Sequence, residues 1–246
     1  MREVEITSIH RMTPRVKQFE LVADETFEYE PGQHTQLHFE RDSDGEGDQN
    51  DGEGSEDEEV VRPYTATGLP GTDSITLAIK RYDDGTASVY MHERDPGDTI
   101  EIEELDGNLY LRDLDSDVAF VSTGTGITPM MAMVKQYLRD GNGHATFLYG
   151  EKSQEDVMYR ETLDQLEAEN DDLRVVYSLS DEDWSGRTGH IQEHVEDVVP
   201  DPEGTDFYCC GVPGMVVETE ERLTDIGVPE ERIYSEGWEE DEVSEE

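Results

Sequence analysis

The sequence predicts a small antiparallel β-barrel followed by a doubly wound parallel α/β sheet. Two observations support this prediction. The first half of the chain reads as short extended segments joined by turns, with one short helix. After about Asp115, apolar segments alternate with helical segments, and this order is typical of a parallel sheet. The 246 residues suffice for two domains of ordinary size. We therefore expect domains over 1–114 and 115–238, followed by an acidic, disordered tail over 239–246.

The barrel is expected to contain six strands and one helix. The Pro31-Gly32 pair marks a turn before the third strand. The expected strands cover 4–10, 16–22, 33–39, 62–68, 75–81 and 99–103, and the helix covers 86–93.

A strongly acidic segment separates the third and fourth of these strands. Residues 41–59 include ten acidic residues and several glycines but no apolar residue. Such a composition predicts a solvated loop between two strands. A docking surface for a cationic partner is the alternative interpretation of the same segment.

The second domain is expected to alternate strands with helices. Thr128 and Pro129 suit the N-cap and the first position of a helix. The expected strands cover 118–122, 145–149, 173–179, 207–210 and 233–235, and the expected helices cover 129–139, 160–169, 191–198 and 215–225.

The charge of the chain limits its partners and its environment. It has 63 acidic and 18 basic residues, a net charge of −45, and only four lysines. Nucleic acid and anionic membranes would be repelled, and no basic stripe offers a footprint for them. No apolar run approaches the roughly 18 residues of a membrane span, and the start of the chain does not resemble a signal peptide. An acid-saturated surface in a folded protein predicts a salt-rich cytoplasm, because molar salt shortens the Debye length to roughly 3 Å.

The two cysteines, Cys209 and Cys210, are neighbours in the sequence, and the chain has no CxxC pair. This pattern argues against structural zinc and against a cluster held by four thiolates, so no metal site is expected. It also favours a reducing, cytoplasmic location.

Three short motifs carry the candidate chemistry. Arg62-Pro63-Tyr64-Thr65 offers a cation, an aromatic face and a hydroxyl, although an ordinary edge strand has the same appearance. Gly124-Thr125-Gly126-Ile127-Thr128-Pro129 lies between an apolar strand and a helix, where a phosphate-binding turn is expected; an ordinary βα turn is the alternative. Cys210-Gly211-Val212-Pro213-Gly214-Met215 follows an apolar strand, and Cys210 could simply be a small buried residue.

A fourth segment supports the first motif. Ile79-Lys80-Arg81 precedes Gly85-Thr86-Ala87-Ser88, which is expected to open a helix. Amides at a helix start, together with the hydroxyls of Thr86 and Ser88, would bind an anion.

Taken together and in this order, the motifs resemble the ferredoxin–NADP⁺ reductase family. The family patterns are RxY(S/T), GxGxxP and CGxxxM, and this chain matches all three. The resemblance extends from about Val4 to Trp238. It departs from the family at 104–108, where a Gly-Pro-x-Gly segment is usual, and this departure concerns the adenine end of the flavin site. The resemblance implies a FAD domain followed by an NAD(P) domain, and a FAD-dependent NAD(P)H oxidoreductase.

The resemblance also implies which residues form the site. Thr65, Cys210 and Glu236 would be catalytic: Thr65 at flavin N5, Cys210 as a positioning residue near the nicotinamide, and Glu236 as a proton relay. Trp238 would cover the flavin face opposite Tyr64. The remaining FAD residues would be Arg62, Pro63, Ile79, Lys80, Arg81, Gly85, Thr86, Ala87 and Ser88, and the NAD(P) residues would be Gly124, Thr125, Gly126, Thr128, Ser180, Arg187, Cys210, Gly211 and Met215.

The coenzyme and the acceptor are less directly indicated. Acidic residues 181–183 follow Ser180, and Arg187 is the nearest cation, so NADH is favoured over NADPH. The electron acceptor would be a separate ferredoxin, haem protein or small molecule. Two alternatives remain: an electron-transfer subunit of a multicomponent oxygenase or reductase, and a flavin-bound module without turnover.

The charge generates a first prediction. We expect the native circular dichroism signal to be lost in dilute buffer and restored by molar KCl, because salt screens repulsion among the surface carboxylates. A titration of ellipticity against KCl measures this. A full native signal in dilute buffer would show that the acidic surface is indifferent to salt.

Overall fold

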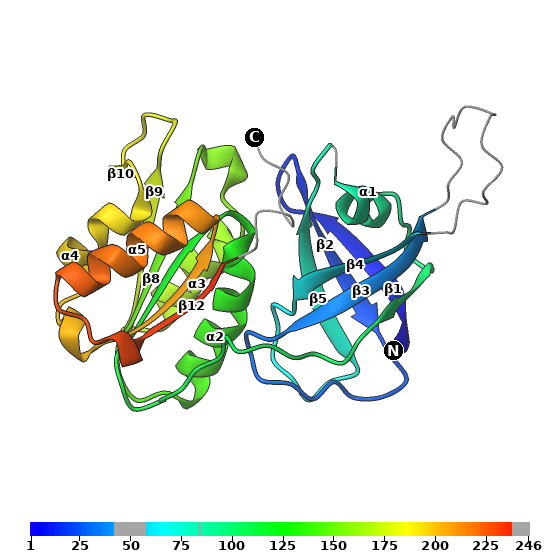
Figure 1. Ribbon diagram of the computed structural model, residues 1–246, viewed down its shortest axis with the longest axis horizontal. Helices are drawn as coiled ribbons and strands as arrows, with labels where there is room; N and C mark the ends of the chain where they lie inside the picture. Colours follow the sequence, from blue (N-terminus) through cyan, green and yellow to red (C-terminus); the bar gives the residue numbers. More distant parts are fainter. Residues whose placement is uncertain (42–57, 84, 238–246) are drawn as a thin grey trace.

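A computed structural model of the chain contains two six-stranded sheets that lie beside each other (Figure 1). The structure describes residues 1–41, 58–83 and 85–237. The first sheet is antiparallel and the second is parallel, with helices on both faces. The predicted order of a barrel followed by a doubly wound α/β sheet is therefore confirmed.

The first sheet has the strand order β4-β3-β6-β1-β2-β5. Its strands are β1 (Arg2–Arg11), β2 (Val16–Val22), β3 (His34–Arg41), β4 (Glu58–Thr65), β5 (Ser74–Lys80) and β6 (Thr99–Ile102). After β4, Ala66 pairs with Leu77 and the Thr67 amide donates to the Thr76 carbonyl at 2.9 Å, which brings the two outer strands together. The helix α1 (Thr86–His92) packs against β4 and β5.

The fourth strand differs from its prediction at both ends. It begins at Glu58, inside the segment expected to be an acidic loop, and ends at Thr65 instead of Gly68. The start moves because β4 pairs with β3 as far as Arg41 opposite Glu58. The end moves because the chain turns toward β5 after Thr65. Most of the predicted acidic loop, 42–57, lies outside the described residues, as do 238–246.

The second sheet has the order β10-β9-β8-β7-β11-β12, and every neighbouring pair is parallel. Its strands are β7 (Val118–Thr123), β8 (Ala145–Glu151), β9 (Leu173–Leu179), β10 (Arg187–Thr188), β11 (Asp206–Gly211) and β12 (Ile233–Gly237). The short edge strand β10 was not predicted, because two residues carry no periodic signal.

Helices cover the two faces of this sheet, as Figure 1 shows. On one face, α2 (Ile127–Asp140) and α3 (Arg160–Glu169) bury Phe120 and Phe147. On the other, α4 (Val195–Val198) and α5 (Pro213–Asp225) bury Val121. Successive residues of a strand point to opposite faces, so Cys210 packs in the first cluster and Cys209 in the second.

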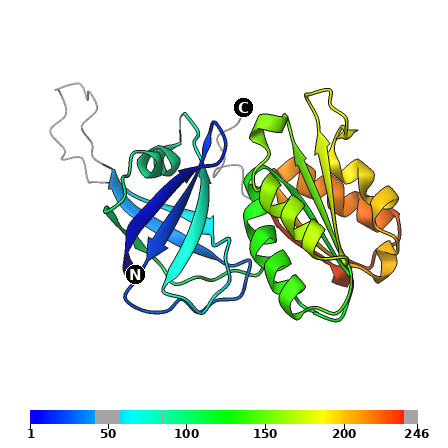
Figure 2. The same ribbon diagram turned by 180° about the vertical axis from the view of Figure 1, so that it is seen from behind.

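The helix α2 also packs against the barrel, and both views show it between the two sheets (Figures 1 and 2). Its buried Met130, Met131 and Met133 belong to one apolar cluster with Val16, Ala78 and Leu109 of the first half of the chain. The two halves therefore share a continuous core, with α2 as the common element.

Several helices start or end differently from their predictions; α5, for example, begins at Pro213 instead of Met215. A 3₁₀ turn over Gly124–Gly126 runs directly into α2, so the helix begins at Ile127 and Thr128 is not its N-cap. The predicted helix 191–198 is a 3₁₀ turn (Ile191–His194) followed by α4. Among the described residues, no helix combines the length and the apolar character needed to cross a membrane.

Candidate functional site

The second and third motifs meet at the carboxyl edge of the parallel sheet. The strands β7, β8, β9 and β10 follow each other in one direction, whereas β11 and β12 lie on the other side of β7. This makes the gap between β7 and β11 the topological switch point, where open α/β sheets bind ligands. The turn after β7 contains Gly124, Thr125 and Gly126, and β11 ends with Cys210 and Gly211.

These two motifs are in direct backbone contact. A Cβ atom on Gly126 would overlap the carbonyl oxygen of Cys210, and a Cβ on Gly211 would overlap Thr123 Oγ1 and the end of Met215. Gly124 has φ +55°, and nothing lies within 4 Å of where its Cβ would be. Gly124 therefore gives the turn its left-handed conformation, and Gly126 permits the close packing of the turn against β11.

Thr128 stabilises the turn from within the helix. Its hydroxyl donates to the Thr125 carbonyl at 2.8 Å. It is buried, at 4 % exposure. Thr128 therefore shapes the turn, although the sequence predicted it as a cap of the following helix.

Across the edge of the sheet, Ser122, Cys210 and Glu236 occupy neighbouring positions on β7, β11 and β12. Paired residues of parallel strands point to the same face, so these three side chains form a row. Burial raises the pKa of the fully buried Cys210 thiol, and the nearby Glu236 carboxylate adds to the effect. Ser122, which we did not predict, is the polar last residue of an apolar run before a glycine turn, and that pattern could have identified it.

The first motif lies at the end of β4. Tyr64 is partly buried, and burial raises the pKa of its phenol. Thr65 is the last residue of the strand and is 3 % exposed. The buried hydroxyls of Thr65 and Ser122 have no hydrogen-bond partner among the described residues. Buried polar atoms are nearly always paired, so these two hydroxyls suit a site that a polar cofactor completes.

Some of the polar groups expected to bind a pyrophosphate, in Arg62 and in residues 79–88, already form hydrogen bonds within the protein. The Ser88 hydroxyl accepts from the Tyr82 amide at 3.1 Å, which ties the chain after β5 to the start of α1. Within the part of the chain that the structure describes, no side-chain hydrogen bond caps this helix start at Gly85. Arg62 donates from Nη1 to its neighbour's carbonyl at Val61, at 2.8 Å. Lys80 and Arg81 are partly buried, whereas Ile79 and Ala87 are buried in the core of the first sheet.

The flavin and dinucleotide segments touch each other. The strand β5 packs against the 3₁₀ turn Gly124–Gly126, and Tyr82, just beyond β5, lies near the Thr125 side chain. Close by, the Tyr149 hydroxyl donates to Glu151 Oε1 at 2.7 Å and lies 3.2 Å from the Gly124 carbonyl oxygen. Burial raises the pKa of Glu151.

A second contact between the halves joins Thr65 to Glu236 through His34. His34 is paired with Thr65 across the β3–β4 ladder. Its Nδ1 atom lies 3.6 Å from Glu236 Oε1. No local pattern in the sequence identifies His34, because its proximity to Glu236 arises only when the two sheets pack together.

Ser180 and Arg187 lie apart from the turn, near the end of β9. The Ser180 hydroxyl donates to Asp181 at 2.9 Å. The Arg187 guanidinium contacts Asp197 Oδ2 and His194 Nδ1, each at 3.2 Å. These residues are on the same carboxyl edge as the turn, two strands away, so an extended ligand could reach both places. Trp238 lies outside the described residues.

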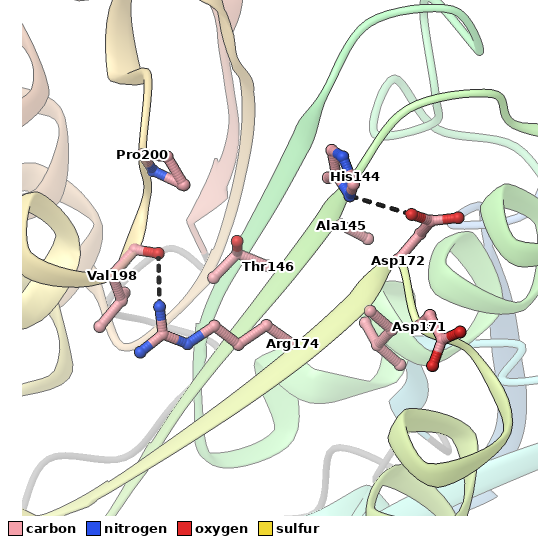
Figure 3. A pocket seen from close by; sticks show the side chains of 9 residues that line it. His144, Ala145, Thr146, Asp171, Asp172, Arg174, Val198 and Pro200 are labelled. Carbon is pink, nitrogen blue, oxygen red and sulfur yellow. Dashed lines mark hydrogen bonds and ion pairs between the residues drawn. The ribbon is translucent and has the colours of Figure 1, made fainter.

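The opposite edge of the sheet has a shallow pocket that does not belong to this arrangement (Figure 3). It lies at the amino ends of β8 and β9. His144 and Asp172 form an exposed ion pair there at 3.1 Å, and Arg174 donates to the Val198 carbonyl at 3.3 Å. None of the predicted site residues lines this pocket.

The burial of the two cysteines makes their chemistry testable. We expect neither thiol of the native protein to react with a disulfide reagent at neutral pH, because both are fully buried and burial raises both pKa values. After unfolding, both should react. Counting reactive thiols before and after adding guanidinium chloride measures this. A thiol that reacts rapidly in the native protein would contradict the placement of Cys210.

Comparisons with known proteins agree with this arrangement. Residues 3–110 match an oxidoreductase FAD-binding domain, and residues 120–221 match an oxidoreductase NAD-binding domain. Ferredoxin–NADP reductase B of Sorangium cellulosum (strain So ce56) is 33 % identical over 193 residues, which cover 73 % of this chain and 79 % of that protein. One component of the Na⁺-translocating NADH-quinone reductase of Yersinia pestis (strain Pestoides F) is 31 % identical over 72 % of this chain, and the chain spans 48 % of its length.

Solved structures show the same fold. The FAD/NAD-binding domain of nitric oxide dioxygenase from Vibrio cholerae O1 biovar El Tor aligns with a TM-score of 0.85 at 22 % identity, over 96 % of this chain and 98 % of that one. A ferredoxin–NADP⁺ reductase from Neisseria gonorrhoeae aligns with a TM-score of 0.79 at 21 % identity, over 96 % and 97 %. With its two matched domains and its relative from Sorangium cellulosum, the chain belongs to the ferredoxin–NADP⁺ reductase family of FAD- and NAD(P)-binding oxidoreductases.

Proposed function

We propose that this protein is a FAD-dependent NAD(P)H oxidoreductase that passes electrons from the nicotinamide, through the flavin, to a separate acceptor. The observation that carries the proposal is the packing of β5, in the flavin segment, against the dinucleotide turn Gly124–Gly126. Hydride transfer requires two cofactors face to face, and these segments are the ones expected to hold them. FAD, when bound, can take up a hydride and release single electrons.

The residues of β4 would hold the flavin ring. Tyr64 offers an aromatic face for offset stacking. The unpartnered Thr65 hydroxyl can donate or accept, and therefore suits a ring nitrogen whose hydrogen bonding changes with redox state. Arg62 supplies a planar cation for a pyrophosphate, provided that its guanidinium exchanges its contact with the Val61 carbonyl.

The row at the carboxyl edge of the sheet would orient the nicotinamide. The Cys210 thiol is fully buried, so it would keep water away from the ring, and burial raises its pKa and so favours the neutral form. The Ser122 hydroxyl is available to an amide or ribose group. Glu236 would accept or supply a proton, and His34 lies within ion-pair distance of it.

The acceptor in this proposal is a separate molecule, and the relatives are named for different acceptors. One relative is named for ferredoxin and another for a quinone. A ferredoxin, a haem protein or a small molecule would each serve here. Two further functions remain candidates: an electron-transfer subunit of a multicomponent oxygenase or reductase, and a flavin-binding module without turnover.

The residues after β9 favour NADH. A 2′-phosphate near Ser180 would meet Asp181, which already accepts the Ser180 hydroxyl. Arg187, the cation that could have neutralised the phosphate, is engaged with Asp197 and His194. Carboxylates suit ribose hydroxyls and repel a phosphate.

Anaerobic reduction tests the proposed function directly. At molar KCl, we expect the purified yellow protein to be bleached by a reduced nicotinamide. A yellow protein that neither NADH nor NADPH bleaches would favour the non-catalytic module.

A variant tests the placement of the flavin ring. Tyr64→Ala should bind FAD more weakly, by roughly 1 kcal/mol or more, because it removes the stacked face. Unchanged FAD content in this variant would contradict our placement of the ring.

The coenzyme preference has its own test. We expect a higher kcat/KM for NADH than for NADPH, and a strong preference for NADPH would overturn the assignment. Asp181→Arg should raise kcat/KM for NADPH by about tenfold, equivalent to about 1.4 kcal/mol, because it replaces a repulsive charge with an attractive one. Asp183→Arg, an exposed acidic position two residues away, serves as the matched control.

A further inference from the structure

Two side chains of the NAD(P) half converge on one residue of the FAD half. Lys135 Nζ donates to the Thr67 carbonyl oxygen at 2.8 Å. The Tyr159 hydroxyl donates to Thr67 Oγ1 at 3.3 Å. Thr67 is 2 % exposed, and its own hydroxyl donates onward to the Thr76 carbonyl on β5 at 3.2 Å. Thr67 is therefore fixed from both halves of the chain at once.

The positions of these residues connect the two expected cofactor sites. Thr67 is two residues beyond Thr65 and follows directly from β4. Lys135 is on α2, eight residues after Ile127, where the helix leaves the dinucleotide turn. At 1.5 Å per residue this is about 12 Å of rigid helix. Helix α2 thus joins the turn at one end to the flavin strand through the Lys135–Thr67 hydrogen bond.

The choice of a lysine here is not explained by stability. Lys135 is partly buried, and this burial lowers its pKa. Among the described residues, no carboxylate lies within 4 Å of it. A cation removed from water without a counter-charge is costly, and an apolar side chain of similar size would pack there at a lower cost.

Tyr159 is held in a conformation that also needs an explanation. It has φ +54°, and of the described residues it is the one non-glycine with positive φ. A left-handed conformation is strained for a tyrosine and persists only where its surroundings fix it. It lies directly before α3, and its hydroxyl reaches Thr67.

We propose that Lys135, supported by Tyr159, is a positioning residue that holds the flavin strand in register with the dinucleotide turn through Thr67. The inference rests on the proposed hydride transfer. Reaction rates depend steeply on the separation and alignment of the reacting atoms, and displacements of about 1 Å can lower a rate a hundredfold. Fixing Thr67 limits how far the two expected cofactor sites can separate.

The test compares two lysines that make the same bond. Lys135→Met removes the donor that crosses between the halves. Lys17→Met is the matched control, because Lys17 Nζ donates to the His92 carbonyl at 2.7 Å within the FAD half alone. Lys135→Arg restores a cationic donor. Each full-length variant is loaded with FAD at molar KCl and mixed with NADH in a stopped-flow instrument.

In Lys135→Met we expect the limiting rate of flavin reduction to fall about tenfold, while FAD content and the Kd for NADH change less than about twofold. The long-wavelength charge-transfer absorbance of the reduced protein with NAD⁺ should weaken, and amide exchange should accelerate at 64–68 in the protein without nicotinamide. Lys17→Met should keep the wild-type rate, and Lys135→Arg should recover most of it.

A limiting rate within about twofold of wild type, in folded Lys135→Met with full FAD, would overturn the proposal. If Lys135→Met loses FAD or does not fold, Tyr159→Phe decides: a lower limiting rate supports the positioning role, and an unchanged rate refutes it. If neither coenzyme reduces the wild-type protein, both the proposed function and the positioning role fail. If the wild type is reduced and Lys135→Met is reduced at the same rate, only the positioning role fails.

Discussion

The packing of α2 between the two sheets is the constraint on which the rest of this structure depends. Its methionines share one apolar cluster with the barrel residues Val16, Ala78 and Leu109. On its other side it covers the aromatic residues of the parallel sheet, including Phe120 and Phe147. Because protein interiors are close-packed, a displacement of this helix would be felt in both sheets. The helix therefore defines how the flavin half faces the nicotinamide half.

The packing of α2 also determines how the segments of the site are placed relative to each other. The N-terminus of α2 is the glycine turn, and Gly126 packs on the backbone of Cys210 without room for a side chain. Farther along the same helix, Lys135 reaches the segment just beyond Thr65. The hydroxyls of Thr65 and Ser122 remain buried without partners among the described residues. A polar cofactor that supplies their partners would complete an arrangement whose protein part is already assembled.

The interface between the halves does not depend mainly on charge. Its contacts include an apolar cluster and the hydrogen bonds of Lys135 and Tyr159 to Thr67, and His34 lies 3.6 Å from Glu236. Apolar burial is insensitive to Debye screening, whereas repulsion among exposed carboxylates depends on it. In a chain with a net charge of −45, the apolar part of this interface therefore does not depend on how far salt screens the surface carboxylates.

The sequence by itself determined the fold class, the order of the two halves and the three motifs. Strand and helix periods, together with the glycine turn after an apolar strand, are local signals, and local signals survive without tertiary context. Element ends were less predictable: β4 begins at Glu58 because β3 provides a partner there, and α2 begins at Ile127 because a 3₁₀ turn leads into it. Only the tertiary structure decided that His34 lies beside Glu236 and that Lys135 and Tyr159 meet at Thr67. These residues are 68 to 202 positions apart, and no periodic pattern encodes a contact between separate sheets.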